Sequence, residues 1–302
     1  MSEFRRRLMM LSKKKKMPNY LAFTALANGT FTLTIGASVA LSDLAYVEYS
    51  TDEGETWVKT NNVASTTVTI TTPTITQGNR VLWRGSGIRM ARGTSSDNYS
   101  TFSATCNHDI EGHIGSLLHG TDESNFGTIP STYAFALLFS GDTRLISSSN
   151  LELADNIANY CYARMFNGCS NHESTFKEIR AKSLTAYSMN RMFYGNSKLE
   201  KAPDILATSA SGNYVIQYAF YNCSKLSYIK CLLTSKSSTT FGNWVSGVAS
   251  SGIFVKNINA TWTDSGVSGV PSGWTIIYYN PSTDKYYLSD KTTECDDHGN
   301  VI

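Results

Sequence analysis

The sequence predicts a mainly β protein with α/β repeats, in which a small antiparallel sandwich is followed by a short solenoid. Two observations predict this arrangement: short alternating strands in the first half, and a 27-residue repeat in the second. The repeat is marked by four phenylalanines at equal spacing: Phe139, Phe166, Phe193 and Phe220. A fixed period of this size is typical of a solenoid, in which each unit buries its apolar side only against its neighbours.

Two further columns repeat in phase with the phenylalanines. Two residues after them stand the types that most readily adopt a left-handed conformation, Gly141, Gly168, Gly195 and Asn222. Six residues after them stand Leu145, His172, Leu199 and Leu226. This column predicts an apolar stack that is interrupted at His172, where residues 171–176 are expected to loop outward. Each unit is expected to form a short helix before the phenylalanine, as in 156–166, and extended chain after it.

The chain divides into five predicted parts. Residues 1–17 form a basic arm, 18–104 a β-sandwich, 105–130 a connector, 131–273 the solenoid with its C-terminal cap, and 274–302 a terminal hairpin and polar tail. In the first half, Asn28-Gly29 predicts a hairpin between the apolar runs 20–26 and 30–35. Short strands with Gly, Asn and Asp turns at this spacing are typical of an immunoglobulin-like sandwich.

The positive charge of the chain is concentrated at its N-terminus. Of its 26 basic and 24 acidic residues, seven basic and one acidic lie in residues 1–17, which leaves a net charge of −4 on the remainder. The arm mixes basic and apolar groups, which favours anchoring to an acidic protein partner through Phe4, Arg5, Arg6, Arg7, Leu8, Met9, Lys13, Lys14, Lys15 and Lys16. The alternatives are binding of nucleic acid or anionic membrane by charge alone, and a solvated tail.

No apolar run approaches the roughly 20 residues of a membrane-spanning helix, so membrane insertion is not expected. The chain also shows no secretory signal, because Leu8 to Leu11 is shorter than a signal core and runs into four lysines. The protein is therefore expected to stay in the compartment where it is made until lysis releases it. The six cysteines are expected to be free, small buried side chains.

One local motif suggests catalysis but has a structural explanation. Ser50, Asp52, Gly54, Thr56 and Trp57 match the S-x-D-x-G-x-T-W pattern of the Asp-box, which is familiar from sialidases. The chemistry of the motif is that of a turn, since Asp accepts backbone hydrogen bonds and Gly takes a positive φ. A propeller would repeat the motif in each blade, whereas it occurs once here. We interpret it as a structural turn.

Other polar clusters do not predict an enzyme. His108, Asp109, Glu111, His113 and His119 lie close in sequence, but their spacing does not place two imidazoles on one helical face. The sequence has no Ser-His-Asp order, phosphate-binding loop or paired-carboxylate motif above background. We therefore expect no metal site, no cofactor and no catalytic residues.

The repeat resembles a known family. Its F-x-G-C-x-x-L kernel and the Cys-Tyr-x-x-Met-Phe run that ends at Phe166 resemble the BspA-type leucine-rich repeats of gut bacterial surface proteins and phages. The stretch 244–276 looks like the usual end of such arrays, and the strands of the first half resemble the domain that commonly precedes them. The opening FRRRLMM resembles a short leader of structural proteins from phages and prophages of Bacteroides-type hosts.

The resemblance implies a non-enzymatic phage virion surface protein, a head or tail fibre, whose arm binds other virion proteins. Its location would be the virion surface, and a homo-oligomer such as a trimer is expected by analogy. The solenoid would attach to a glycan or protein of the host surface. Tyr194 and Tyr221 are candidate ligand-binding residues because they follow successive phenylalanines and should lie one above the other; the alternative, which the sequence favours, is ordinary packing within the solenoid. Sequence-specific nucleic-acid recognition is not expected.

Two other functions remain open at this point. A bacterial cell-surface adhesin would carry the same modules but needs export. A tail-associated glycan-degrading enzyme needs two acidic residues about 5–10 Å apart in a cleft.

Overall fold

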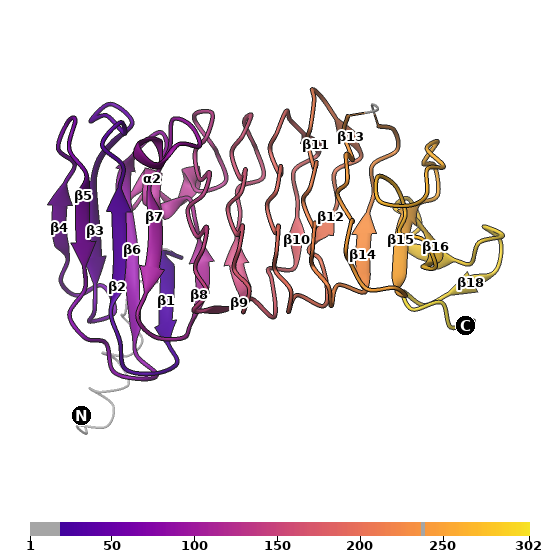
Figure 1. The fold of residues 1–302 in the computed structure, drawn as a ribbon, viewed down its shortest axis with the longest axis horizontal. Helices are drawn as coiled ribbons and strands as arrows, with labels where there is room; N and C mark the ends of the chain where they lie inside the picture. The colour runs from indigo at the N-terminus through magenta and orange to yellow at the C-terminus, as the bar shows by residue number, and fades with distance from the viewer. Residues whose placement is uncertain (1–18, 237–238) are drawn as a thin grey trace, which may run out of the picture.

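Two β-sheets at one end, a row of parallel coils and a terminal cap follow one another along the long axis of the molecule (Figure 1). The computed structural model describes residues 19–236 and 239–302. The mainly β class and the solenoid, which has about four turns, are as expected from the sequence. The anchoring residues proposed between Phe4 and Lys16 lie outside the described residues.

The first sheet has the strand order β4-β3-β6-β1-β8-β9, and the second has the order β5-β2-β7. The strands are β1 (Leu21–Ala25), β2 (Phe31–Ile35), β3 (Leu44–Ser50), β4 (Val58–Asn61), β5 (Val68–Thr71), β6 (Arg80–Gly87), β7 (Thr101–Ala104), β8 (His108–His113) and β9 (Leu145–Glu152). Three short helical segments accompany them: η1 (Ser96–Asn98), α2 (Ser116–His119) and η2 (Glu123–Asn125).

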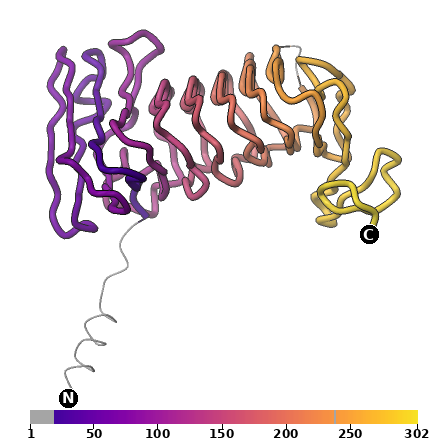
Figure 2. The backbone as a smooth tube through the Cα atoms, turned by 60° about the horizontal axis from the view of Figure 1, so that its bottom comes forward, coloured from indigo at the N-terminus to yellow at the C-terminus, as the bar shows by residue number. Residues whose placement is uncertain are grey.

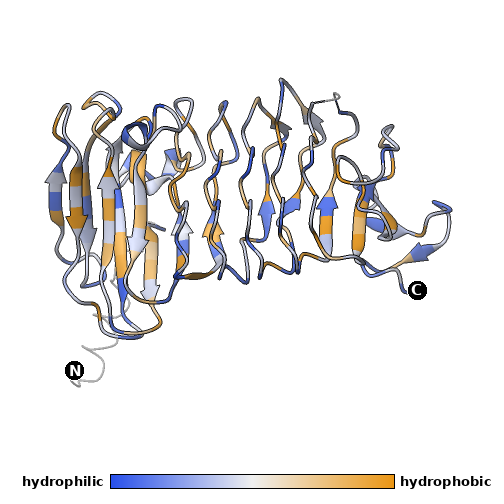
Figure 3. Ribbon diagram, in the orientation of Figure 1, coloured by the Kyte–Doolittle hydropathy of each residue, from blue (hydrophilic) through white to orange (hydrophobic). Residues whose placement is uncertain are grey.

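Aromatic side chains fill the space between these two sheets. The ring of Phe23 on β1 lies 5.3 Å from that of Phe31 on β2 and 4.7 Å from that of Phe102 on β7. Hydrophobic residues alternate with more polar ones along the strands (Figure 3), as in β2, where every second residue is buried. Alternation of this kind places one face of each strand in the core and the other in solvent.

The hairpin predicted at Asn28-Gly29 is wrong. The strand β1 pairs with β6 and β8, and β2 pairs with β5 and β7, so the dipeptide carries the chain from one sheet to the other. Neither residue has a positive φ. Glycine is required at position 29 for a different reason, since a Cβ there would lie 2.5 Å from that of Cys106. Passage of the chain from one sheet to the other is favoured because it buries both Phe23 and Phe31 in the core between the sheets.

The segment 105–130 joins the two halves through a strand in the middle of the first sheet. Within it, β8 pairs antiparallel with β1 and parallel with β9, the first strand of the solenoid. The aromatic core continues through this junction, since the ring of Phe139 lies 5.8 Å from that of Phe102. The N-terminal sheets therefore cover the open end of the first coil.

The coils of the solenoid stack in a row (Figure 2), and their strands pair in parallel from β10 to β16. The strands are β10 (Glu178–Ile179), β11 (Ser183–Leu184), β12 (Asp204–Ile205), β13 (Ser209–Ala210), β14 (Tyr228–Cys231), β15 (Ile253–Asn257), β16 (Thr275–Asn280), β17 (Lys285–Tyr287) and β18 (Glu294–Cys295). From β16 onward the pairing is antiparallel, and the terminal hairpin turns at Asn280-Pro281.

The helices expected before each phenylalanine are not formed. The segment is instead a ribbon of successive β-turns, as in the bonds from Ala163 N to Tyr160 O and from Met165 N to Tyr162 O. The alternate amides bond to the next coil, with Arg164 N donating to Asn190 O at 2.8 Å. A left-handed residue at every fourth position, such as Tyr160 and Arg164, prevents the helix.

The phenylalanines and the residue two positions after them are placed as the repeat predicts. Phe139, Phe166, Phe193 and Phe220 are fully buried and stack with ring centroids 5.2 to 5.5 Å apart. Gly141, Gly168, Gly195 and Asn222 have φ values of 79°, 78°, 77° and 59°. Trp244 continues the stack in the closing coil, 5.9 Å from Phe220.

The outward loop expected at His172 is wrong. The imidazole is fully buried and lies 5.1 Å from the ring of Phe166. Its Nε2 is 2.9 Å from Ser148 Oγ and its Nδ1 is 3.2 Å from Asn196 Nδ2. These two bonds satisfy both ring nitrogens, which allows a polar side chain to occupy a position held by leucine in the other coils.

All six cysteines are free and buried. Among residues 19–236 and 239–302, no helix is long and apolar enough to cross a membrane.

Candidate functional site

The outer side of the turn ribbons carries three columns of side chains, which we call the turn face. The first column is Tyr133, Tyr160, Tyr187 and Tyr214; the second is Leu137, Arg164, Arg191 and Tyr218; the third is Ser140, Asn167, Tyr194 and Tyr221. Every member except Leu137 is half-buried, with part of the side chain exposed to solvent. The face thus presents aromatic, cationic and amide groups in register over four coils.

The backbone holds the first two columns in a costly conformation. All eight of their residues have φ between 54° and 60°. A left-handed residue other than Gly or Asn costs roughly 1–2 kcal/mol. Large side chains are therefore kept at positions where glycine would be less strained, which indicates that the side chains themselves are needed there.

The tyrosines of the first column cover one another's ring faces. Tyr133 and Tyr160 have ring centroids 4.4 Å apart, and Tyr160 and Tyr187 have centroids 4.3 Å apart with planes inclined by 8°. Tyr187 and Tyr214 are 5.1 Å apart and tilted. Partial burial is the main reason that the pKa of Tyr160 is raised. The column therefore offers ring edges and hydroxyl groups to a ligand.

Tyr194 and Tyr221, the residues selected from the sequence, also lie together. Their ring centroids are 4.9 Å apart and their planes are inclined by 8°. The faces that would stack on a sugar between them are already in contact with each other. These two tyrosines can still donate hydrogen bonds and contribute edge contacts.

The two arginines of the second column are the only charged side chains of the turn ribbons. The segments 131–141, 158–168, 185–195, 212–222 and 239–247 contain no Asp or Glu. Arg191 lies over the ring of Tyr218 at 5.1 Å and that of Tyr194 at 5.8 Å. Burial, and secondly the charge of Arg191, lower the pKa of Arg164. The positive charge of this face is thus not balanced locally.

The strand side of the solenoid has two shallow grooves with mixed charges. One, of about 290 Å³, is lined by Glu152, Lys177, Glu178 and Arg180 among others; the next, of about 310 Å³, also contacts Lys177. Several acids here have cationic partners: Arg180 bonds Asp155 at 2.9 Å and Lys198 bonds Glu173 at 3.3 Å. Balanced charges of this kind are typical of a solvated surface.

The Asp-box residues form a self-contained turn. Asp52 accepts hydrogen bonds from Thr56 N at 2.9 Å and from the hydroxyls of Thr56 and Ser50. Gly54 has φ of 85° and Trp57 Nε1 donates to its carbonyl at 3.1 Å. These bonds occupy the carboxylate within the turn.

The histidines of residues 108–119 do not form a metal site. His108 is buried in the aromatic core, 5.5 Å from the ring of Phe23. His113 is buried beside Phe126, and burial lowers its pKa to about 4. His119 Nε2 instead lies 2.9 Å from Thr128 O. The three imidazoles therefore serve separate structural contacts.

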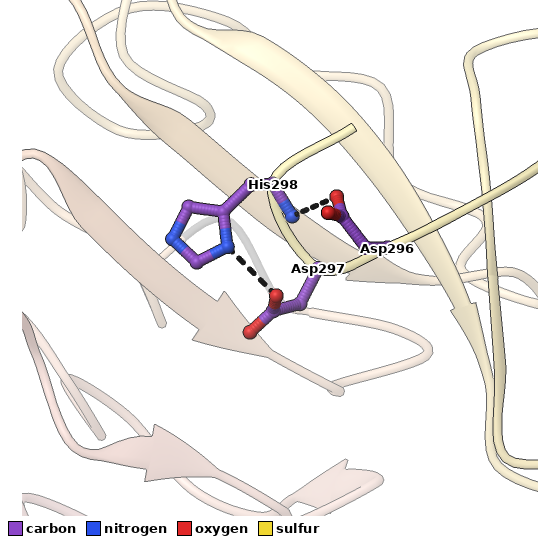
Figure 4. Close-up of side chains that lie close together, drawn as sticks. All are labelled: Asp296, Asp297 and His298. Atoms are coloured by element: carbon purple, nitrogen blue, oxygen red, sulfur yellow. Dashed lines mark hydrogen bonds and ion pairs between the residues drawn. The ribbon is translucent and has the colours of Figure 1, made fainter. Parts of the chain in front are cut away.

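Asp296, Asp297 and His298 in the C-terminal loop bring three ligand atoms within 4.8 Å of one another (Figure 4). Asp296 already accepts bonds from the backbone amides of His298 and Asn300, at 2.9 and 2.8 Å. His298 Nδ1 lies 2.7 Å from Asp297 Oδ1. The arrangement is that of an Asx-type turn on an exposed loop, so it supports no metal assignment.

Comparison of the chain with protein-family models, with curated proteins and with solved structures finds no match.

Sequence reasoning missed most of the turn face. A tyrosine stands six residues before each of the four phenylalanines, so the first column was detectable from the period alone. The second column could not be found in this way, because Leu137, Arg164, Arg191 and Tyr218 share no chemical type. The 27-residue period aligns these four positions, but only the turn geometry shows that their side chains lie on the outer side of the coils.

Proposed function

We propose that the protein is a non-enzymatic phage virion surface protein, a head or tail fibre, that attaches to the bacterial host through the turn face of its solenoid. The observation that carries this proposal is a set of eight mostly large side chains on left-handed backbone positions, in register over four coils. Tyrosine and arginine are the residue types enriched in the energetically important parts of binding surfaces. A face of this composition fits recognition better than it fits a structural role.

In this proposal the two N-terminal sheets form an immunoglobulin-like sandwich that spaces the solenoid away from the particle. The coils belong to the BspA type of leucine-rich repeat, which the kernel around Phe166 supports. The basic arm, residues 1–17, anchors the chain to other virion proteins, and the subunits assemble as a homo-oligomer such as a trimer. The opening FRRRLMM, which resembles a leader of phage structural proteins, supports the virion location.

The two rival functions differ from this proposal in location and in chemistry. A bacterial surface adhesin would use the same face but reside on the cell envelope. A glycan-degrading enzyme needs a general acid with a raised pKa opposite a second carboxylate. Burial does raise the pKa of Asp204, but this carboxylate lies 3.6 Å from Lys230 Nζ, which favours a structural ion pair.

Mass spectrometry of purified phage particles from a culture that carries the gene tests the proposal. We expect the protein in the particles at a defined copy number, which would also separate head decoration from a tail fibre. Its absence from particles, together with its presence on bacterial envelopes, would establish the adhesin instead.

A further inference from the structure

Arg164 and Arg191 are two positive charges without a counter-charge. They occupy equivalent positions in successive coils, which are about 4.8 Å apart in a parallel sheet. Within the described part of the chain, neither guanidinium forms an ion pair with a carboxylate. Most of the other described arginines do form one, such as Arg84 with Glu48 and Arg180 with Asp155. The turn segments supply no acid that could approach them.

The electrostatics of the pair favour an anion from outside. The pKa of Arg164 is lowered first by its partial burial and then by the charge of Arg191. Each of these effects reflects a cost of holding the positive charge at this place. An anion that bonds both guanidinium groups would remove the repulsion between them and replace lost solvation by charge-assisted hydrogen bonds.

The surroundings of the pair hold it in position and add hydrogen-bonding groups. The guanidinium of Arg191 lies over the rings of Tyr194 and Tyr218, and these contacts limit the freedom of its side chain. The neighbouring Asn190 Nδ2 donates to Gln217 Oε1 at 3.2 Å, so these amides also line up from coil to coil. In each coil the first column precedes the second by four residues, and its half-buried tyrosines add hydroxyl groups to the face.

The shape and the aromatic packing of the face restrict the class of anion. The grooves on the strand side and the pocket beside Thr51 contain no residue of the turn face. The turn face instead presents its columns along the row of coils, which suits an extended chain. Single-stranded nucleic acid binds by stacking its bases on open aromatic faces, and here the ring faces cover one another. Hydroxyl groups and amides instead match a ligand that is rich in hydroxyls.

We propose that the turn face binds a linear acidic polysaccharide, with sugar carboxylates paired to Arg164 and Arg191 and the chain running along the stack of coils. This inference rests on the proposed attachment function and names its ligand class. The tyrosine hydroxyls of the first column and the half-buried amide of Gln217, which Asn190 holds in place, bond the sugar hydroxyls.

Binding of the full-length protein to immobilised polygalacturonate at low ionic strength tests this inference. The double variant Arg164→Asn/Arg191→Asn removes both charges while asparagine tolerates the left-handed backbone, so its thermal unfolding should match or exceed that of the wild type. The matched control is Lys177→Gln/Lys182→Gln, which removes two exposed charges from outside the turn face. Neutral dextran, polyglutamate and a single-stranded oligonucleotide serve as comparison ligands.

We expect polygalacturonate to bind, salt to weaken the binding, and the arginine variant to lose affinity roughly tenfold or more while the lysine control keeps it. Failure to bind polygalacturonate, or equal binding by the arginine variant, would overturn the inference. Equal affinity for dextran would show that the charge of the ligand does not determine binding. Equal affinity for polyglutamate or the oligonucleotide would show that the sugar does not determine binding. Either result would also overturn the inference.

Attachment of the labelled protein to host cells separates this inference from the proposed function. If the protein binds cells and the arginine variant binds equally well, the acidic polysaccharide is wrong and attachment stands. If the protein binds polygalacturonate through the arginines but binds no host cells, the ligand class stands and the attachment function fails.

Discussion

The rings of Phe166 and Phe193 lie nearly parallel, with centroids 5.4 Å apart and planes inclined by 7°. Both side chains are fully buried, and each is the only phenylalanine that its turn ribbon contributes to the stack. The core of each coil therefore depends on contact between its own phenylalanine ring and that of the next coil. Stability in such an array comes from the interfaces between neighbouring repeats.

Truncation of one ring in this stack should damage two interfaces at once. We expect Phe193→Ala to lower the free energy of unfolding by about 3–5 kcal/mol, as measured by urea denaturation. Phe193→Leu keeps most of the volume and should cost less. A loss below about 1 kcal/mol for the alanine variant would mean that the ring stack is not the core of the repeat.

The glycine that follows the phenylalanine is needed for its backbone angle. At Gly195, φ is 77°, and an added Cβ would meet no atom closer than Gly168 Cα at 3.9 Å. We expect Gly195→Ala to cost roughly 1–2 kcal/mol and Gly195→Asn to cost less, because asparagine adopts this conformation more readily. Thermal unfolding of the two variants measures the difference, and equal losses would contradict the strain argument.

The sequence was sufficient to predict the register of the solenoid but not the conformation between its marker residues. The phenylalanine recurs in all four units, and the residue two positions after it is always glycine or asparagine, so the burial of the one and the backbone angle of the other could be predicted. The helix expected over 156–166 follows from residues such as Ala163 and Met165, which have good helix propensity. Tyr160 and Arg164 adopt a left-handed conformation, but tyrosine and arginine have no intrinsic preference for it. The turn ribbon could therefore not be predicted from these residues.

The error at Asn28-Gly29 has a similar cause. The dipeptide reports a local preference for a tight turn, whereas the partner of each flanking strand depends on contacts far away in the sequence. Phe23 packs on Phe102 and Phe31 on His108, and these contacts place the two strands in different sheets. At the candidate site, both the tyrosine column and the arginine pair recur with the period, but the period does not show which side chains lie on the outer face of the coil.

The basic arm is the part of the proposal that a truncation can test directly. We expect a variant that lacks residues 1–17 to remain soluble, with the same thermal unfolding as the full-length chain. It should no longer be incorporated into phage particles, as measured by mass spectrometry of purified particles. Unchanged incorporation would rule out the arm as the anchor.

The turn at Asp52 should depend on pH in a defined direction. Hydrogen bonds from Thr56, first through its hydroxyl and then through its amide, lower the pKa of Asp52 from 3.8 to about 2. Because the unfolded chain binds this proton more readily, the stabilisation is complete above pH 3.8 and is lost as the pH falls through about 2. We expect Asp52→Ala to destabilise the N-terminal sheets at neutral pH, with a smaller difference from the wild type in acid.

Calorimetric unfolding at several pH values checks the Asp52 variant, and its binding of polygalacturonate should equal that of the wild type. Loss of binding would show that the Asp-box takes part in glycan recognition.

The buried His172 should make the solenoid sensitive to mild acid. Burial lowers the pKa of His172 from 6.5 to about 3. The unfolded state therefore binds more protons between these pH values, and stability falls as the pH drops from 6.5 toward 3, by at most about 1.4 kcal/mol per pH unit for one group. We expect His172→Gln, which keeps hydrogen-bonding capacity without titrating in this range, to show a shallower loss in urea denaturation.

The matched control for His172→Gln is Ser148→Ala. This change removes the hydroxyl that lies 2.9 Å from His172 Nε2 but keeps the imidazole. It should lower stability at every pH and leave the slope between pH 6.5 and 3 close to that of the wild type. Both variants still contain His113, whose pKa is also lowered, to about 4. Part of the dependence of stability on pH therefore remains in both. Equal slopes in the wild type and the glutamine variant would mean that the buried imidazole is not the acid-sensitive group of the solenoid.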